Sequence, residues 1–405
     1  MKILALGGCG EMGRYAVKTL LPLPEITGIT IADIDGDRAR AFAEECGPKT
    51  SHARVDAMDP ADLKKAMAGA DIVMNTTGPY FRFGVRVLDA AIETGCHYLD
   101  LNDDWEPTLE MLALSDKARE AGITAILGLG ASPGVSNLLA ATAVGELDET
   151  LEIYTGWDLD AARPERIGPK VSAAMIHGIH QLTGTIRGFE NGTYTETRPL
   201  TRVVLDFPGM GASTAWTVGH PESVTLPRTF PGLTRSVNVM TTQWYNVGML
   251  KFLGLFVNAG LLSVEALARL AEKLEGPSDP EKNTERMLAE MVMEGGHGLP
   301  PLFSLARGKK DGQPASVGVL VTSAPAGGMG GATGVPLAVG ASLMARGRIT
   351  RRGVFAPEAV LDPKEFFDNL APLCSPPRKN ANQLVLTTRS WEPARVADRL
   401  AELLS

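Results

Sequence analysis

A glycine-rich turn near the start of the chain constrains the fold more than any other feature. The apolar segment 2–6 is followed by a G-x-G-x-x-G pattern at Gly8, Gly10 and Gly13, and a helical segment opens at Glu11. In the order strand, turn, helix, this pattern is typical of a turn that binds the diphosphate of a dinucleotide. Gly8 permits the tight turn, Gly10 lets the diphosphate approach the backbone, and Gly13 lets the helix pack on the strand. The positive end of the helix then faces the phosphates.

The first third of the chain alternates strand-like and helix-like segments. The expected strands are short, nearly continuous apolar runs, as in sheets that are covered on both faces. We therefore expect an α/β fold, a Rossmann-type doubly wound parallel sheet, over residues 1–130. Its strands are expected at 2–6, 27–33, 53–56, 71–76, 97–101 and 123–127.

The pattern changes after Gly130. Apolar and polar residues alternate in several segments, which indicates a mixed or antiparallel sheet with one wet face. A chain of 405 residues is also long for one core. We expect a second, α+β domain over 131–334 and a return of 335–405 to the first domain, with the glycine-rich stretch 326–334 as a loop or hinge. The second domain's expected segments are the strands 151–158, 202–207, 236–244 and 317–323 and the helices 170–183, 263–274 and 281–294.

Composition excludes several classes of protein. With 39 basic and 47 acidic residues, a net charge of -8 and no dense Lys/Arg tract, nucleic acid is not an expected partner. The longest apolar stretch, 249–262, is interrupted by Lys251 and Asn258, so no membrane association is expected. The four cysteines are scattered, and no spacing suits a metal. We expect a cytoplasmic protein with free thiols and no metal.

Asp33 indicates which dinucleotide is bound. It ends the second strand 20 residues after Gly13, where the ribose-binding acid of this pattern is expected. A carboxylate there accepts a hydrogen bond from the 2′-hydroxyl and repels a 2′-phosphate, which favours NAD over NADP. Arg38 and Arg40 lie nearby in the sequence and leave NADP open as an alternative.

Ligands of doubly wound sheets lie outside the carboxyl ends of the strands. Polar residues at these ends are therefore further candidates, although Asp56 and Asp100 are equally suited to capping the turns that follow them. The residues expected to flank the cofactor are Asp56, Thr76, Thr77, Gly78 and Pro79. The residues expected to face the substrate are Tyr98, for which packing is the stronger alternative, and Ser132, which precedes a helix expected from Pro133.

Several of these motifs, together with later ones, resemble the saccharopine dehydrogenase/reductase-like family, whose members include lysine 6-dehydrogenase and carboxynorspermidine dehydrogenase. The resemblance rests on the glycine turn, 32–33, 75–80, 97–100, 132–137, 219–222 and 333–336. It implies a Rossmann domain and an α+β domain that binds substrate and mediates homodimers. It also implies hydride transfer between nicotinamide and a C–N bond of an amino acid, an imine or an opine-like substrate. Several members that use NADP carry Arg after the acid of the second strand, and Ile34 in this chain supports NAD.

Candidates for acid/base chemistry follow from position and from this resemblance. Asp100 lies at a strand end, while His220 and Glu222 match a family motif in a Gly/Pro-rich loop. For a histidine in a loop, a structural hydrogen bond is the stronger alternative to catalysis. Asn137 and Arg228 are candidate substrate contacts, with solvent exposure and a surface ion pair as the respective alternatives.

Other functions stay open at this point. A nicotinamide-binding sensor or interaction protein without turnover would share the glycine turn. So would an oxidoreductase acting on an alcohol, carbonyl or enoyl group, because a fold does not determine a substrate.

Overall fold

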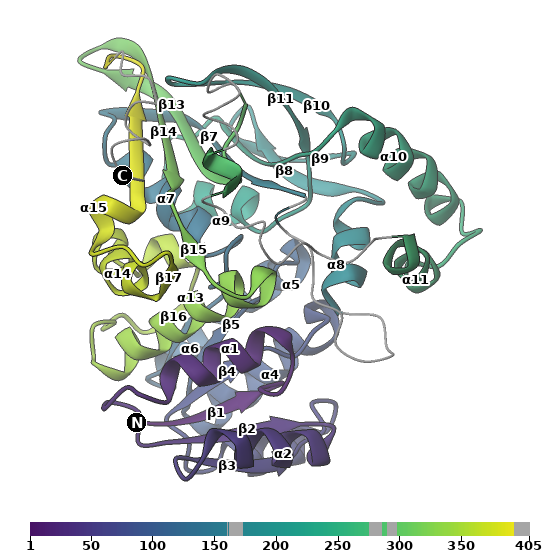
Figure 1. Ribbon diagram of the computed structural model, residues 1–405, viewed down its shortest axis with the longest axis vertical. Coiled ribbons are helices and arrows are strands. Elements are labelled where there is room, and N and C mark those ends of the chain that lie inside the picture. The colour runs from purple at the N-terminus through teal and green to yellow at the C-terminus, as the bar shows by residue number, and fades with distance from the viewer. Residues whose placement is uncertain (160, 162–172, 275–285, 290–297, 393–405) are drawn as a thin grey trace. The chain divides into compact units, whose positions relative to one another are not determined.

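The computed structural model describes residues 1–159, 161, 173–274, 286–289 and 298–392. The chain forms two compact units, each built from two segments of sequence (Figure 1). The first unit comprises residues 1–134 and 329–361, and the second comprises 135–328 and 362–405. The chain passes from the first unit to the second after residue 134, four residues later than the expected boundary at residue 130. Of the segment 335–405, only the part up to residue 361 belongs to the first unit.

The first unit is built on a seven-stranded parallel sheet, which confirms the expected Rossmann-type fold. Its strand order is β16-β6-β5-β4-β1-β2-β3, with the crossover of the doubly wound topology beside β1. The strands are β1 (Lys2–Leu6), β2 (Gly28–Asp33), β3 (Thr50–Arg54), β4 (Ile72–Asn75), β5 (His97–Asp100), β6 (Thr124–Ile126) and β16 (Gly353–Phe355). The helices are α1 (Glu11–Leu20), α2 (Gly36–Cys46), α3 (Pro60–Met67), α4 (Tyr80–Thr94), α5 (Trp105–Leu112), α6 (Ser115–Glu120) and α13 (Gly328–Ala345).

Local sequence explains where several of these helices begin. The Asp35 carboxylate accepts a hydrogen bond from the Arg38 N–H at 3.1 Å and caps α2. The Asp59 carboxylate caps α3 in the same way, with Pro60 as the first helical residue. Between β5 and β6 the chain forms two short helices, α5 and α6.

Helix α13 begins within the stretch that we expected to be a loop or hinge, so that expectation is wrong. Its glycines serve close packing against α1: a Cβ on Gly334 would lie 2.2 Å from the Met12 carbonyl oxygen, and one on Gly330 would lie 2.8 Å from the Tyr15 ring. Glycine lowers the intrinsic helix propensity of α13, but it allows α13 and α1 to pack in close contact. By length and composition α13 could span a membrane, but 72% of it is buried in the fold, as in a core helix.

The second unit is built on a nine-stranded mixed sheet, as expected for its fold class. The main path is β10-β11-β12-β7-β13-β14-β18, with β8 pairing β12 and β9. Only β12 and β7 run parallel, and the other pairs are antiparallel. The strands are β7 (Glu149–Asp158), β8 (Ile186–Glu190), β9 (Thr193–Thr197), β10 (Arg202–Phe207), β11 (Gly211–Thr217), β12 (Arg235–Thr241), β13 (Leu302–Lys310), β14 (Gln313–Val321) and β18 (Val385–Arg389). The strands β8, β9, β11, β13 and β18 were not expected from the sequence.

Helices of this unit include α7 (Val135–Val144), α8 (Ala173–Gln181), α9 (Glu222–Thr229), α10 (Trp244–Asn258), α11 (Val264–Leu274) and α14 (Pro363–Leu370). The expected helix at 281–294 lies largely outside the described residues. Helix α7 begins at Val135, two residues later than expected. The core of the unit includes Phe207 and Phe303, whose rings meet edge to face at 5.7 Å.

Candidate functional site

The turn between β1 and α1 has a shape that only glycine permits. Gly7 has a φ of 74°, in the left-handed region. A Cβ on Gly8 would lie 2.7 Å from the Ala5 carbonyl oxygen, and one on Gly13 would lie 2.6 Å from the Gly7 carbonyl oxygen. A Cβ on Gly10 would meet a single close atom, the Gly7 carbonyl oxygen at 3.1 Å. The turn is therefore tight at Gly8 and Gly13 and more open at Gly10.

Helix α1 starts directly behind this turn. Gly10 is its N-cap residue and has no side chain to cap the helix. An α-helix presents the N–H groups of its first turn at its N-terminal end, here those of Glu11, Met12 and Gly13. Together with the helix dipole, these groups suit an anion such as a diphosphate. The turn therefore fits the dinucleotide that its sequence predicts.

Asp33 lies at the end of β2, beside this turn. Its Oδ2 accepts a hydrogen bond from the Cys9 thiol at 3.0 Å, and its Oδ1 accepts one from the Asp35 N–H at 3.1 Å. Arg38 Nη2 donates to the Cys9 carbonyl oxygen at 3.1 Å. Burial, followed by the hydrogen bond to Asp33, raises the pKa of the Cys9 thiol to about 12, so the thiol stays protonated and acts as a donor. Ile34, the next residue, is 55% exposed.

The other expected cofactor residues lie at the ends of β3 and β4. The Asp56 Oδ1 accepts from the Met58 N–H at 2.8 Å, which is the turn-capping role considered as an alternative. Thr76 Oγ1 donates to the Leu6 carbonyl oxygen at 3.0 Å and thereby ties β4 to β1 beside the glycine turn. Thr77, Gly78 and Pro79 follow at the same end of the sheet and lead into α4.

Asp100 is fully buried at the end of β5 and its carboxylate is surrounded by donors. Its Oδ1 accepts from the N–H groups of Gly128, at 2.7 Å, and Asn102, at 3.0 Å. Its Oδ2 accepts from the Tyr98 hydroxyl at 2.8 Å. Burial raises the pKa of Asp100 from 3.8 to about 6, against the lowering effect of these hydrogen bonds. A carboxylate held in this way joins the loops after β5 and β6, which favours a positioning role.

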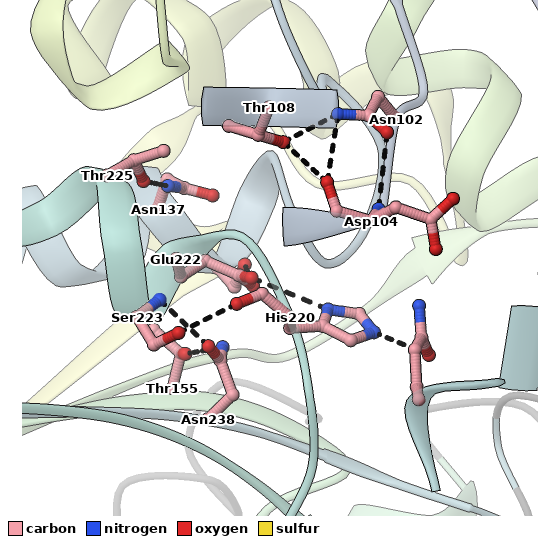
Figure 2. Close-up of polar contacts among 12 residues, drawn as sticks. Asn102, Asp104, Thr108, Asn137, Thr155, His220, Glu222, Ser223, Thr225 and Asn238 are labelled. Carbon is pink, nitrogen blue, oxygen red and sulfur yellow. Dashed lines mark hydrogen bonds and ion pairs between the residues drawn. The ribbon is translucent and has the colours of Figure 1, made fainter. Parts of the chain in front are cut away.

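Tyr98 and the loop after Asp100 extend this network. The Tyr98 hydroxyl also accepts a hydrogen bond from Asn75 Nδ2 at 3.0 Å, and burial raises the pKa of this phenol well above its usual value. Tyr98 is thus a packed, protonated donor. Asn102 Nδ2 donates to the Thr108 hydroxyl at 2.6 Å and to the Asp104 carbonyl oxygen at 3.2 Å (Figure 2). Ser132 is half-buried and lies three residues before α7.

In the second unit, His220 and Glu222 lie together in a buried polar cluster (Figure 2). His220 Nδ1 lies 3.4 Å from Glu222 Oε2, and His220 Nε2 lies 3.1 Å from Gln181 Oε1. The Ser136 hydroxyl of α7 donates to Glu222 Oε1 at 2.6 Å. The four side chains form a chain of polar contacts in the order Ser136, Glu222, His220, Gln181. A histidine oriented by a carboxylate can hold or transfer a proton.

Local structure explains how this cluster forms. A Cβ on Gly219 would lie 2.6 Å from Ile186 Cγ2, so only glycine allows the backbone to pass β8 so closely. The Gly219 N–H donates to the Gln181 carbonyl oxygen at 3.2 Å, which brings His220 beside Gln181. Glu222 is the first residue of α9, where the helix dipole favours a carboxylate.

The remaining expected substrate residues, Asn137 and Arg228, also belong to the second unit. Asn137 is buried in α7, and its Nδ2 lies 3.4 Å from the Thr225 hydroxyl (Figure 2). Arg228 is exposed in the last turn of α9, and its positive charge and a hydrogen bond lower the pKa of Tyr194 against the larger, raising effect of burial. Arg228 is thus accessible to an anion from solvent.

Comparison with known proteins identifies the family. Residues 3–126 match the family model of the saccharopine dehydrogenase NADP binding domain, and residues 130–372 match that of the saccharopine dehydrogenase C-terminal domain. The chain belongs to the saccharopine dehydrogenase family. It is therefore related to oxidoreductases that bind a nicotinamide cofactor, and the resemblance stated from its motifs is confirmed.

Two full-length relatives and one solved structure illustrate the relationship. The chain is 25% identical to carboxyaminopropylagmatine dehydrogenase of Synechocystis sp. over 394 residues, covering 91% of this chain and 95% of the relative. It is 24% identical to carboxynorspermidine synthase of Vibrio alginolyticus over 411 residues, covering 91% and 94%. Apo saccharopine dehydrogenase (L-Glu forming) of Saccharomyces cerevisiae has a similar fold, with a TM-score of 0.58, 18% identity and coverage of 91% and 96%.

Sequence reasoning missed three side chains that the structure brings to these clusters. Cys9 occupies an x position of the G-x-G-x-x-G pattern, which specifies no residue there, and its contact with Asp33 depends on how β1 and β2 pair. Ser136 stands within a motif carrying the family resemblance but has no chemical signal of its own. Gln181 is 39 residues from His220, so nothing local in the sequence connects the two.

Proposed function

We propose that this protein is a dehydrogenase or reductase that uses NAD and acts on a C–N bond of an amino acid or of a carboxyl-bearing imine. The observation that carries the proposal is the glycine turn with Asp33 beside it, in a chain whose full-length relatives are named for carboxyl-bearing amines. When bound, a nicotinamide ring supplies or accepts the hydride. The chain's own residues have to hold the substrate and move the proton.

The names of the two relatives suggest the substrate class. Carboxyaminopropylagmatine and carboxynorspermidine are both carboxyl-bearing derivatives of basic amines. We propose that this chain likewise handles an imine formed from a carboxyl-bearing aldehyde and an amine. The exposed guanidinium of Arg228 is the proposed contact for the carboxylate, because Arg binds carboxylates in a bidentate manner.

The hydrogen bonds around Asp33 support a preference for NAD. Cys9 and Asp35 each donate to one of its oxygens, so the carboxylate stays fixed and retains lone pairs for a ribose hydroxyl. A 2′-phosphate would meet this negative charge. Arg38, held at the Cys9 carbonyl oxygen, is the group that could offset the repulsion.

Cofactor titration tests the preference directly. We expect a lower dissociation constant for NADH than for NADPH, measured by fluorescence, and we expect Asp33→Ser to narrow or reverse the difference. The matched control is Asp37→Ser in α2, because the Asp37 side chain is 87% exposed. Tighter binding of NADPH to the unaltered protein would contradict the proposal.

His220 is the proposed proton-handling group, with Glu222 holding it in orientation. Replacing His220 by Asn should lower kcat about 100-fold or more, within the usual range for loss of an acid/base group. Glu222→Gln should shift the pH dependence of kcat. NADH binding should be unchanged in both variants, and His52→Asn, at an exposed position in β3, is the control.

A substrate screen separates this function from its alternatives. The protein would be mixed with NADH, a carboxyl-bearing aldehyde and a series of amines, and oxidation of NADH would be followed by absorbance. We expect turnover that requires both the aldehyde and the amine. Turnover with the aldehyde alone would favour an alcohol dehydrogenase. Cofactor binding without turnover on amine, alcohol or enoyl substrates would favour a sensor.

A further inference from the structure

The backbone of His220 is held in place by its neighbours. The Ser223 hydroxyl donates to the His220 carbonyl oxygen at 2.9 Å, and the Ser223 N–H donates to Asn238 Oδ1 at 2.9 Å. His220 is 4% exposed, and the centre of its ring lies 5.7 Å from the centre of the Trp157 ring. Rotation about the side-chain bonds is the freedom that remains, so the groups at the two ring nitrogens fix how the ring lies.

These two nitrogens meet different partners (Figure 2). His220 Nδ1 lies 3.4 Å from Glu222 Oε2, which is longer than the about 2.7–3.2 Å of a normal N–H···O hydrogen bond. His220 Nε2 lies 3.1 Å from Gln181 Oε1, within that range. Gln181 therefore orients the ring in addition to Glu222, and from the opposite nitrogen.

Gln181 is itself fixed by the fold. It is the last residue of α8 and is 6% exposed. Its carbonyl oxygen accepts a hydrogen bond from the Gly219 N–H at 3.2 Å, so both its backbone and its side chain contact the segment that carries His220. The Thr183 hydroxyl closes the end of α8 by donating to the Ile179 carbonyl oxygen at 2.8 Å. The tertiary structure thus places the amide of Gln181 at Nε2.

An amide suits a ring that changes its number of protons. A neutral imidazole has one donor and one acceptor nitrogen, whereas an imidazolium has two donors. The glutamine amide carries an acceptor oxygen and a donor NH2 group, so a half-turn about its last bond lets it meet Nε2 in either state. An ionised carboxylate, such as that of Glu222, offers acceptors only. Of the three side chains at the ring, Glu222 of α9 is ionisable, while Gln181 of α8 and Trp157 of β7 are not.

We propose that Gln181 is a positioning residue for proton transfer by His220, holding Nε2 as an acceptor before the transfer and as a donor after it. This inference rests on the proposed function, in which His220 handles the proton. The neutral amide is the partner that a substrate nitrogen replaces, because a contact with a carboxylate is charge-assisted and stronger. As the imine is reduced by hydride from the nicotinamide, its nitrogen takes the proton from Nε2, and water later returns a proton to the ring. Glu222 keeps the remaining proton on Nδ1 throughout.

Proton–nitrogen NMR correlation spectra of the full chain, with isotope-labelled histidine, test this proposal without substrate. The chain has six histidines, and the His220 signals are those that His220→Asn lacks. In acid, the unaltered protein should show the Nε2 proton of His220, because the hydrogen bond to Gln181 slows its exchange with water. Gln181→Met, with a side chain of similar length and no hydrogen-bonding amide, should lose this signal. Gln313→Met, at an exposed position in β14, is the matched control and should keep it.

A second variant tests the two-sided character of the amide. Gln181→Glu places a carboxylate at each ring nitrogen, so His220 should hold its proton at least about tenfold more tightly, which shifts its NMR titration to higher pH. Both variants should also lower kcat with the aldehyde–amine mixture at least about 10-fold, because the ring is misplaced in one and releases its proton less readily in the other. Circular dichroism and NADH binding should not change.

Three results would overturn the proposal. They are a missing Nε2 proton in the unaltered protein, a slowly exchanging Nε2 proton in Gln181→Met, and a His220 titration in Gln181→Glu that matches the unaltered protein. Full turnover by His220→Asn would instead contradict the proposed role of His220 in catalysis. The NMR measurements need no turnover, so they still show whether Gln181 orients the ring.

Discussion

Asp100→Asn is expected to remove a pH-dependent part of the protein's stability. Burial raises the pKa of this carboxyl to about 6 in the folded protein, against 3.8 when it is exposed. Between these two values the folded state holds a proton that the unfolded state has lost, so the free energy of unfolding falls as the pH rises. A difference of about two units corresponds to about 3 kcal/mol, all of it lost by neutral pH.

The amide variant has no such titration. Its Oδ1 can still accept from the N–H groups of Gly128 and Asn102, but its NH2 group would face the Tyr98 hydroxyl, which now donates to Asp100. We expect that mismatch to cost about 1–2 kcal/mol at every pH. The variant should therefore be less stable than the unaltered protein in acid, and this deficit should disappear or reverse near neutrality.

Urea unfolding, followed by tryptophan fluorescence between about pH 4 and pH 8, measures this difference. Trp105 reports on the unit that contains Asp100, since it is the one tryptophan of residues 1–134 and 329–361. Asp37→Asn, at an exposed position, should follow the unaltered protein. Parallel pH profiles for Asp100→Asn and the unaltered protein would refute the argument that burial perturbs this carboxyl.

Three further predictions concern other parts of the structure. Gly13→Ala should weaken NADH binding at least about 10-fold, because its Cβ would lie 2.6 Å from a backbone oxygen; Gly178→Ala, where the space is open, should leave the dissociation constant from calorimetry unchanged. Phe303→Ala should destabilise the second unit by about 3–5 kcal/mol in urea unfolding without affecting NADH binding, and a loss below about 1 kcal/mol would contradict its place in the core. Iodoacetamide should modify Cys9 at least about 100-fold more slowly than a free thiol, since each unit of raised pKa lowers the thiolate fraction tenfold; mass spectrometry showing rapid labelling of Cys9 would contradict the hydrogen bond to Asp33.

The local parts of this protein follow from the amino-acid sequence alone. The glycine turn and the helix caps at Asp35 and Asp59 depend on contacts between residues that are close in the sequence. The acid at the end of β2 is likewise placed by the spacing of the glycine pattern. The sequence pattern therefore predicts the structure at these positions. The same is true of the short apolar strands of the parallel sheet. Together these features were sufficient for the Rossmann-type fold and for the expected location of a dinucleotide.

Which distant groups meet depends on how the whole chain folds. The strands β8, β13 and β18 each pair with a strand that is distant in the sequence. The glycines of α13 are explained only by its close packing against α1. The contacts of His220 with Gln181 and of Glu222 with Ser136 span 39 and 86 residues. Burial also alters the acidity of a side chain. Asp100, which the sequence suggests as an acid/base group at a strand end, is enclosed by three hydrogen-bond donors, and burial raises its pKa. Propensity and spacing carry no information about such contacts, because their energies come from packing and desolvation between segments that the chain brings together only when it folds.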